Sequence, residues 1–418
     1  MSRSDKDVLI VGGGVIGLCS AWYLSEAGYQ VTIIDRDVDR TESCSEENAG
    51  MIVPSHFIPL AAPGVISQGL KWMLNPSSPF YLRPRLDPRL WAWCWQFARH
   101  SNAKHVEGSC ELLRDLSLES RRLFLKLTDE LGVEFVTRGL MMLCQSEEGL
   151  KHEVKVAEAA NALGVDAEVC DRDRVHELDP GAQMNVIGGV WFRQDCHLHP
   201  GRFLEALRKG ISNLGGKFVD GEAVDFVCEG SRVKAVVTAT GHEIEADSVV
   251  LAGGAWTPEV AAKLSLKLPM QGGKGYSLML SNPPELPELC SLLKEARVAV
   301  TPMGDQLRVA GTMEICGKDL SVNRKRLQGI IDSFCRFFPA FEPENFEGIR
   351  PWSGLRPCSP DGLPYLGRVP GIENAIVATG HSMLGLSLGP ITGRLVTEIV
   401  SGNATSIDTG QMEPGRFS

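Results

Sequence analysis

Residues 8–35, VLIVGGGVIGLCSAWYLSEAGYQVTIID, constrain the fold more than any other part of this 418-residue chain. The stretch opens on four apolar residues, a run typical of a central parallel strand that is covered on both faces. Gly12, Gly14 and Gly17 follow with the G-x-G-x-x-G spacing. The first glycine allows a tight turn, the second lets backbone approach a pyrophosphate, and the third lets a helix pack on the strand. This order of features predicts a dinucleotide-binding site.

The residues after the glycine turn complete the same pattern. A helix is predicted to begin at Val15, and its first N–H groups, at Val15 and Ile16, would present the positive end of the helix dipole to a phosphate. A second strand ends at Asp35, where a carboxylate can accept hydrogen bonds from an adenosine ribose, and Arg36 comes directly after it. The alternative, a glycine-rich turn without a ligand, does not explain why strand, helix, second strand and acid all fall in register.

Composition excludes some classes of partner. Forty-two basic and 52 acidic residues give a formal net charge of −10, so no nucleic-acid partner is expected, and simple solubility accounts for the acidic excess. The 12 cysteines are scattered singly with no C-x-x-C pair, which is typical of a reducing compartment. A chain of this length has room for two or three domains.

The location of the protein is predicted from what the chain lacks. The first predicted strand begins at residue 8, which leaves no room for a signal or transit peptide, and no apolar run is as long as a membrane span. We therefore expect a cytoplasmic protein. Residues 90–97, LWAWCWQF, are predicted to form a helix. Buried packing is the favoured interpretation of its three tryptophans, and peripheral contact with the inner face of a membrane stays open as the alternative.

Hydrophobic periodicity predicts a mixture of helices and strands along the rest of the chain. Further helices are expected over residues 106–131, 150–163, 200–214 and 323–338. Strands are expected over residues 186–192, 216–227, 233–240, 247–252, 268–281, 297–302 and 307–314. Residues 216–227 and 233–240 are interpreted as a hairpin.

A second strand–glycine–helix unit closes the chain over residues 374–400, with its helix predicted from about Leu386. The strand over residues 247–252 runs into another glycine pair, Gly253-Gly254. Glycine turns at opposite ends of the chain, with this strand between them, predict one nucleotide domain built from discontinuous segments. The strands with alternating patterns would form a second, largely antiparallel domain inserted into it.

Four blocks of sequence resemble the FAD-dependent D-amino acid oxidase superfamily, and within it the D-amino acid dehydrogenase small-subunit type. They are VGGGVIGLCSAWYLSEAGYQVTIID, EENAGMI with AAPG, GKGYS, and GLRPCSPDGLPYLG with ATGHSMLGLSLGPITGRLV, in matching order across nearly the whole chain. The resemblance implies an α/β fold with a Rossmann-like FAD-binding domain and an inserted substrate domain on a mixed, largely antiparallel sheet. We assign residues 1–50, 195–265 and 345–418 to the FAD-binding domain, and residues 51–194 and 266–344 to the substrate-binding domain.

The resemblance also implies contacts with FAD beyond the first glycine turn. Asn48, Ala49 and Gly50 match the family loop that approaches the flavin, and Val224 falls in a hairpin whose backbone commonly meets the adenine. The other expected FAD-binding residues are Gly253, Gly254, Gly380, His381, Leu384, Gly385 and Leu386. The beginning of the last helix can stabilise negative charge on reduced flavin. The alternative for these glycines is plain tight turns.

Non-covalent FAD is expected from two departures from related sequences. Relatives with covalently attached flavin carry a histidine in the region where Glu47 and Asn48 stand, or a cysteine in the later block, which Cys358 does not match well.

His197 and His199 invite a metal interpretation, but no third ligand lies at metal-site spacing, so no metal is expected.

Three residues are candidates for the substrate pocket. Arg356 in GLRP matches an arginine that binds the substrate carboxylate in the family, and a planar, permanently charged guanidinium suits that role. Tyr276 in KGYS could wall the pocket and bring its hydroxyl to the carboxylate, and His56 is a further candidate to line it. The alternatives are a structural arginine in a proline-rich turn and a strand tyrosine packed between domains. His381 has the alternative role of orienting the last glycine turn.

The implied reaction is oxidative deamination of a D-amino acid or of a cyclic D-imino acid such as D-proline or D-hydroxyproline, by hydride transfer from the α-carbon to flavin N5. Met383 stands near the place of a second arginine in some glycine oxidases, which favours an apolar or ring-bearing substrate. Oxygen, a quinone or another redox protein would accept the electrons. The alternatives are a sarcosine- or glycine-type oxidase, a non-catalytic FAD-binding redox subunit, and an NAD dehydrogenase.

Overall fold

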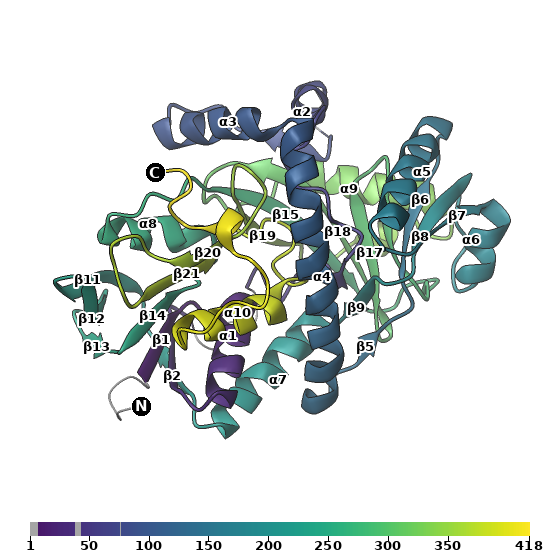
Figure 1. Ribbon diagram of the computed structural model, residues 1–418. Helices are drawn as coiled ribbons and strands as arrows, with labels where there is room; N and C mark the ends of the chain where they lie inside the picture. Colours follow the sequence, from purple (N-terminus) through teal and green to yellow (C-terminus); the bar gives the residue numbers. More distant parts are fainter. Residues whose placement is uncertain (1–6, 38–42, 76) are drawn as a thin grey trace.

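The computed structural model describes residues 7–37, 43–75 and 77–418, and two large sheets organise it (Figure 1). The first has six strands in the order β10-β2-β1-β14-β21-β20, and every neighbouring pair is parallel except β20 with β21. The strands are β1 (Asp7–Val11), β2 (Gln30–Asp35), β10 (Lys217–Asp220), β14 (Ser248–Leu251), β20 (Tyr365–Arg368) and β21 (Ala375–Thr379). Val8, Leu9 and Ile10 are buried, as expected for a central strand covered on both faces.

The two glycine turns meet because their helices pack on each other. α1 (Val15–Glu26) follows β1 and α10 (Gly389–Val400) follows β21, and Figure 1 draws the two helices side by side. A Cβ atom at Gly393 would lie 2.4 Å from the carbonyl oxygen of Cys19, so only glycine permits this close contact. The carboxyl ends of the parallel strands therefore lie at one edge of the sheet, beside the beginnings of both helices.

The second large sheet has nine strands and is mostly antiparallel. The order is β19-β15-β18-β17-β16-β6-β8-β7, with β4 paired to β18; only the β16–β6 and β18–β4 pairs are parallel. The strands are β4 (Phe80–Leu82), β6 (Leu140–Cys144), β7 (Ala167–Asp171), β8 (Gly188–Phe192), β15 (Gln271–Leu280), β16 (Cys290–Leu293), β17 (Val298–Met303), β18 (Gln306–Ile315) and β19 (Trp352–Cys358). The predicted α/β fold with a mixed, largely antiparallel second sheet is confirmed.

Helices and two small sheets surround the large sheets. The helices are α2 (Val65–Met73), α3 (Pro88–His100), α4 (Ala103–Leu131), α5 (Glu147–Ala162), α6 (Arg172–Leu178), α7 (Pro200–Asn213), α8 (Thr257–Ala261) and α9 (Arg324–Phe337). The small sheets consist of β11 (Ala223–Glu229), β12 (Arg232–Thr238) and β13 (Glu243–Glu245), and of β3 (Met51–Ile52), β5 (Phe135–Val136) and β9 (Cys196–Leu198). Both small sheets are antiparallel.

The predicted helices are confirmed, including the tryptophan-rich segment, which is α3. The interpretation of residues 216–227 as one strand of a hairpin is wrong. The chain leaves β10 at Gly221, so β10 joins the parallel sheet and only β11 pairs with β12. An alternating pattern of apolar residues does not tell whether a strand pairs in parallel, as β10 does with β2, or antiparallel, as β11 does with β12. The last helix begins at Gly389, later than the predicted start near Leu386. The two-domain boundaries stay a prediction.

Candidate cofactor and substrate site

An open cavity lies at the carboxyl ends of β1, β2 and β14, beside the beginning of α1. It is open to solvent, and the residues that line it come from segments near both ends and in the middle of the chain. The predicted site residues that line it are Gly12, Gly14, Val15, Ile16, Asp35, Arg36, Asn48, Gly253, Gly254, Arg356, His381, Gly385 and Leu386. The structure thus brings together residues from both ends and the middle of the chain.

The first glycine turn leaves no space for a side chain at Gly12 or at Gly17. Gly12 has φ +116°, and a Cβ atom there would lie 2.6 Å from the carbonyl oxygen of Ala252 on the neighbouring strand segment. A Cβ atom at Gly17 would lie 1.9 Å from the carbonyl oxygen of Gly12, so helix and strand meet backbone to backbone. Gly17 therefore acts on packing and does not line the cavity. Gly14 is the N-cap of α1.

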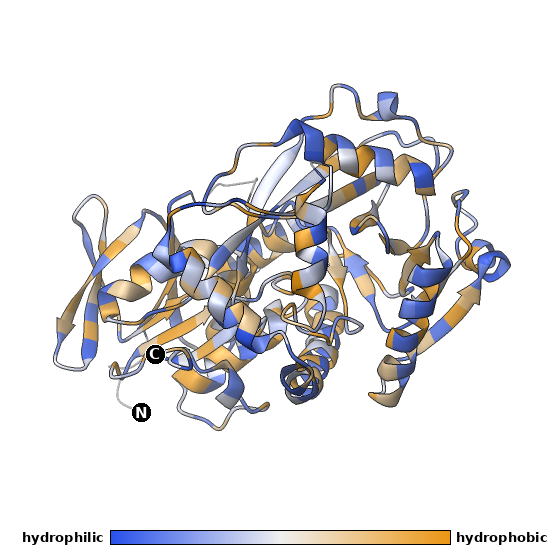
Figure 2. Cartoon of the chain, turned by 90° about the horizontal axis from the view of Figure 1, so that it is seen from above, coloured by the Kyte–Doolittle hydropathy of each residue, from blue (hydrophilic) through white to orange (hydrophobic). Residues whose placement is uncertain are grey.

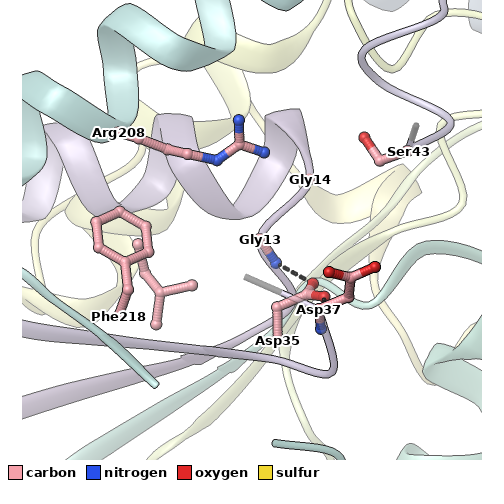
Figure 3. Close-up of a pocket in the computed structure, with 8 residues that line it drawn as sticks. Gly13, Gly14, Asp35, Asp37, Ser43, Arg208 and Phe218 are labelled. Atoms are coloured by element: carbon pink, nitrogen blue, oxygen red, sulfur yellow. Dashed lines mark hydrogen bonds between the residues drawn. The ribbon is translucent and has the colours of Figure 1, made fainter. Parts of the chain in front are cut away.

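Asp35 is bonded to the glycine turn. Its Oδ2 atom accepts a hydrogen bond of 2.7 Å from the backbone N–H of Gly13. Next to it, a recess that shares Gly14, Asp35 and Ser43 with the main cavity continues toward α7 (Figure 3). The Arg208 side chain reaches from α7 toward the turn in Figure 3. This arginine was not predicted, because nothing near it in the chain marks it as a site residue.

The loop that precedes β3 is held in place from two directions. Ser45 Oγ accepts a hydrogen bond of 3.0 Å from the backbone N–H of Val15, at the beginning of α1. The buried Arg308 on β18 donates to the carbonyl oxygen of Asn48 at 2.5 Å and pairs with Glu47 at 2.9 Å. Burial lowers the pKa of Arg308 and Glu47 opposes that shift. The Arg308 anchor was not predicted, since it depends on the pairing of distant strands.

Several predicted cofactor residues lie outside the cavity lining. They are Gly17, Ala49, Gly50, Val224, Gly380 and Leu384. Gly50 has φ +80°, and a Cβ atom there would lie 2.4 Å from the carbonyl oxygen of Leu198. Gly380 has φ +77°, with the ring of Tyr365 2.6 Å from the Cβ position. Both glycines therefore shape the backbone beside the cavity. Val224 is exposed, whereas the preceding residues 221–223 line the cavity.

Arg356 lies on the edge strand β19 and lines the cavity. Its Nη1 atom donates a hydrogen bond of 2.9 Å to the carbonyl oxygen of Thr312. The guanidinium lies over Gly275 on β15, where a Cβ atom would be 2.3 Å from Nη1. Among the residues that the structure describes, no carboxylate forms an ion pair with Arg356. A permanent positive charge therefore faces the cavity with only a carbonyl oxygen to balance it.

Tyr276 does not lie in the cavity lining and its hydroxyl is already used. The side chain is buried, and the hydroxyl donates to Glu314 Oε1 at 2.5 Å and accepts from the backbone N–H of Asn323 at 2.9 Å. Burial, and then the hydrogen bond with Glu314, raise the pKa of Tyr276. This geometry matches the alternative of a packed strand tyrosine, whose hydroxyl is not free to meet a substrate.

His56 also lies away from the cavity lining, in a short chain of polar groups. Its Nδ1 atom is 3.0 Å from Ser55 Oγ, and Ser55 Oγ donates to Asp195 Oδ2 at 2.5 Å. Burial lowers the pKa of His56 to about 4 and raises the pKa of Asp195 to about 7. At neutral pH the imidazole is therefore uncharged, and it cannot replace Arg356 as a cation for a substrate.

His381 lines the cavity near the beginning of α10. Its Nε2 atom is 3.0 Å from Thr392 Oγ1, and burial lowers the pKa of the imidazole to about 3. The Nδ1 atom is buried and has no hydrogen-bond partner among the described residues. Buried polar atoms normally have partners, so this nitrogen fits a site that a polar ligand completes.

The described residues include neither a cluster suited to a metal ion nor a helix suited to spanning a membrane. No group of three or more His, Cys, Asp or Glu in this part of the chain could hold a metal ion. His199 caps α7 by accepting from the backbone N–H of Arg202 at 3.3 Å. No helix within residues 7–37, 43–75 and 77–418 is both long and apolar enough to span a bilayer.

Known proteins match this chain over almost its whole length. The family described as DAO, FAD dependent oxidoreductase, matches residues 7–399. D-amino acid dehydrogenase from Allorhizobium ampelinum is 32% identical over 98% of this chain and 98% of its own length. The protein of the same name from Bradyrhizobium diazoefficiens is 31% identical over 98% and 99%. The crystal structure of glycine oxidase from Geobacillus kaustophilus is similar with a TM-score of 0.78 at 24% identity, over 98% of each chain.

Proposed function

The chain belongs to the family of FAD-dependent oxidoreductases, and we propose that it oxidises a D-amino acid or a cyclic D-imino acid at the α-carbon. It is an amino acid dehydrogenase or oxidase with relatives named D-amino acid dehydrogenase at about 30% identity over nearly the full chain. The observation that carries the substrate proposal is Arg356, a cavity-lining guanidinium without a carboxylate partner among the described residues.

The residues that line the cavity fit FAD by their polar groups and by the glycine turn. In the proposed arrangement, the diphosphate lies at the Gly12–Gly14 turn and the beginning of α1, and the ribose hydroxyls donate hydrogen bonds to the Asp35 carboxylate. His381 and the segment that precedes α10, with Gly385 and Leu386, then contact the flavin. We propose non-covalent attachment, because Asn48 uses its side-chain oxygen to accept from the backbone N–H of Gly50 at 2.9 Å and Cys358 is fully buried.

Arg356 would bind the substrate carboxylate by a charge-assisted, bidentate contact. The carboxylate would meet the N–H groups of the guanidinium that do not donate to the carbonyl oxygen of Thr312. Met383, Leu320 and Trp352 also line the cavity. This apolar lining favours an apolar or ring-bearing side chain, such as that of a proline, over glycine or sarcosine. A redox subunit that only holds FAD would need neither the unpaired guanidinium nor an apolar pocket.

The chemistry divides between cofactor and chain. When bound, FAD supplies the hydride acceptor, flavin N5, for the hydrogen on the substrate α-carbon. The chain orients the substrate: fixing the carboxylate at Arg356 limits how the α-carbon can face the cavity, and such orientation contributes several kcal/mol. The substrate amine must be neutral to release the hydride, so the rate should rise with pH as it deprotonates. No residue of the chain needs to act as a strong base.

The electron acceptor is proposed only by class: oxygen, a quinone or another redox protein. A cytoplasmic location, with peripheral contact with the inner face of the membrane, is the proposed setting. All twelve cysteines are free thiols, as they would be in a reducing compartment.

The substrate proposal is tested with Arg356→Lys, assayed on a D-amino acid and on the amine formed by its decarboxylation. Lysine keeps the charge but loses the planar fork, so loss of one charge-assisted hydrogen bond of about 1.5–3 kcal/mol should lower kcat/KM for the amino acid about ten- to a hundredfold. The amine never uses the contact and should change little. Arg193→Lys, at an exposed site on the surface, is the matched control.

The result separates a substrate-binding arginine from a structural one. Equal losses on both substrates, together with lower thermal stability and FAD content, would assign Arg356 to the scaffold and remove the main support for an amino acid substrate. The attachment of FAD is tested separately by acid precipitation of the holoenzyme. Release of intact FAD into the supernatant supports non-covalent binding, and flavin that stays in the pellet contradicts it.

A further inference from the structure

α2 exposes an apolar stripe that no described part of the chain covers. Ile66, Leu70 and Leu74 follow one another at four-residue spacing, and their exposed fractions are 41%, 61% and 88%. The opposite side of the helix is packed, because a Cβ atom at Gly69 would lie 3.2 Å from the ring of Phe80 on β4. α2 therefore contacts β4 through Gly69, while the three apolar side chains of the stripe stay exposed.

α3 repeats this arrangement with aromatic residues. Its inward face buries Leu90 and Trp93, and Trp93 Nε1 donates a hydrogen bond of 2.9 Å to the carbonyl oxygen of Cys358. Trp91 and Trp95, one turn apart on the outward face, are each 57% exposed. The sequence prediction of buried packing is thus right for one tryptophan and wrong for the other two, because a helix directs alternate tryptophans to different faces.

Both helices lie at the same end of the molecule, at the top of Figure 1, and Figure 2 looks down on that end. We call the outward faces of α2 and α3, with Ile66, Leu70, Leu74, Trp91 and Trp95, the apolar platform. Soluble monomers rarely expose large contiguous apolar patches, and tryptophan is enriched where an apolar phase meets water.

The segment that carries the apolar platform has a formal charge opposite to that of the whole chain. Residues 65–104 contain six Lys or Arg and a single acid, Asp87, whereas the whole chain has 42 basic and 52 acidic residues. Lys71, Arg89 and Arg99 are exposed; Arg89 lies 3.9 Å from Glu259 at the surface, and the Arg99 guanidinium lies 4.6 Å from the centre of the Trp95 ring. Apolar side chains rimmed by cations are the composition of helices that lie in the interface of an anionic membrane.

From this geometry we propose that the apolar platform docks the protein on a bilayer that contains anionic lipids. The aliphatic and indole side chains enter the headgroup region, and the basic side chains remain at the surface, where they meet lipid phosphates. A second copy of this chain would fit the platform less well, since it would bring the positive segments of both copies together. The proposal is independent of the substrate, because it does not involve the cavity.

The test is flotation of the full-length holoenzyme with phosphatidylcholine vesicles, with and without phosphatidylglycerol. The protein should float with the anionic vesicles only, and 1 M salt, which shortens the Debye length from about 10 to about 3 Å, should release much of it. Trp91→Ser with Trp95→Ser should weaken binding at least about tenfold. Arg89→Gln with Arg99→Gln should weaken it about thirtyfold, at about 1 kcal/mol for each charge.

The matched control is Val169→Ser with Leu214→Ser, which removes two exposed apolar side chains elsewhere on the surface and should leave flotation unchanged. All variants should keep wild-type activity with a soluble dye as acceptor. No flotation of the wild type with either vesicle, or an equal loss in the control variant, would overturn the proposal. A wild-type dimer in solution that the Trp91→Ser, Trp95→Ser variant converts to a monomer would assign the platform to self-association and overturn it as well.

Discussion

Gly275→Ala should displace Arg356 without removing its charge. The guanidinium lies directly over Gly275, and a Cβ atom at that position would be 2.3 Å from Nη1, 2.5 Å from Nη2 and 2.7 Å from Cζ of the arginine. The backbone of Gly275 is not in the left-handed region, so alanine brings no strain of its own there. The substitution therefore acts on the position of one side chain.

The size of the effect follows from these distances. Ordinary van der Waals contact of a Cβ atom begins near 3.4 Å, so the guanidinium must move by about 1 Å or more. A misplacement of this size at a substrate-binding group can cost roughly a hundredfold in rate. The hydrogen bond from Arg356 to Thr312 would be broken or bent at the same time. We expect kcat/KM for a D-amino acid to fall about thirty- to a hundredfold, chiefly through a higher KM.

The assay is steady-state turnover with a dye acceptor, accompanied by the flavin absorbance spectrum and by thermal unfolding. Gly108→Ala is the matched control: Gly108 is exposed within α4 with open space at the Cβ position, so alanine should leave turnover unchanged and stabilise the helix by about 1 kcal/mol. Wild-type kcat/KM in Gly275→Ala, with unchanged FAD content, would refute the placement of Arg356 in substrate binding. A fall that is equal for the decarboxylated amine would do the same.

Two further predictions concern carboxylates. Burial raises the pKa of Asp195 from 3.8 in the unfolded chain to about 7, so its contribution to stability is complete below pH 4 and is lost as the pH rises through 7. The free energy of unfolding should fall by about 4 kcal/mol over this range, at about 1.36 kcal/mol for each unit of pKa difference. Asp195→Asn removes the titrating group, so the free energy of unfolding measured in urea should depend less on pH between 4 and 7. The same pH dependence in the variant and the wild type would contradict this assignment. Asp35→Ala removes the acceptor for Gly13 and for a ribose, so FAD should dissociate more readily on dilution while substrate selectivity stays the same, and equal FAD affinity in both proteins would show that the ribose lies elsewhere.

The predicted beginning of the fold depended on local information. The apolar strand, the glycine turn, α1 and Asp35 all lie within residues 8–35, and each constraint acts between near neighbours in the chain. The position of Arg356 was also predictable, because its block resembles that of known relatives. Its role stays a prediction, but the side chain does line the cavity.

Tertiary structure alone decided which polar side chains are free to meet a ligand. The sequence made Tyr276 a candidate pocket residue, but in the folded chain its hydroxyl donates to Glu314 on β18. In the same way, Arg308 donates to the carbonyl oxygen of Asn48, 260 residues earlier in the chain. These partners are set by the pairing and register of strands far apart in sequence. A local pattern tells which face of a strand is apolar, but the groups that face each other across a sheet depend on which strands are neighbours, and only the folded chain determines that.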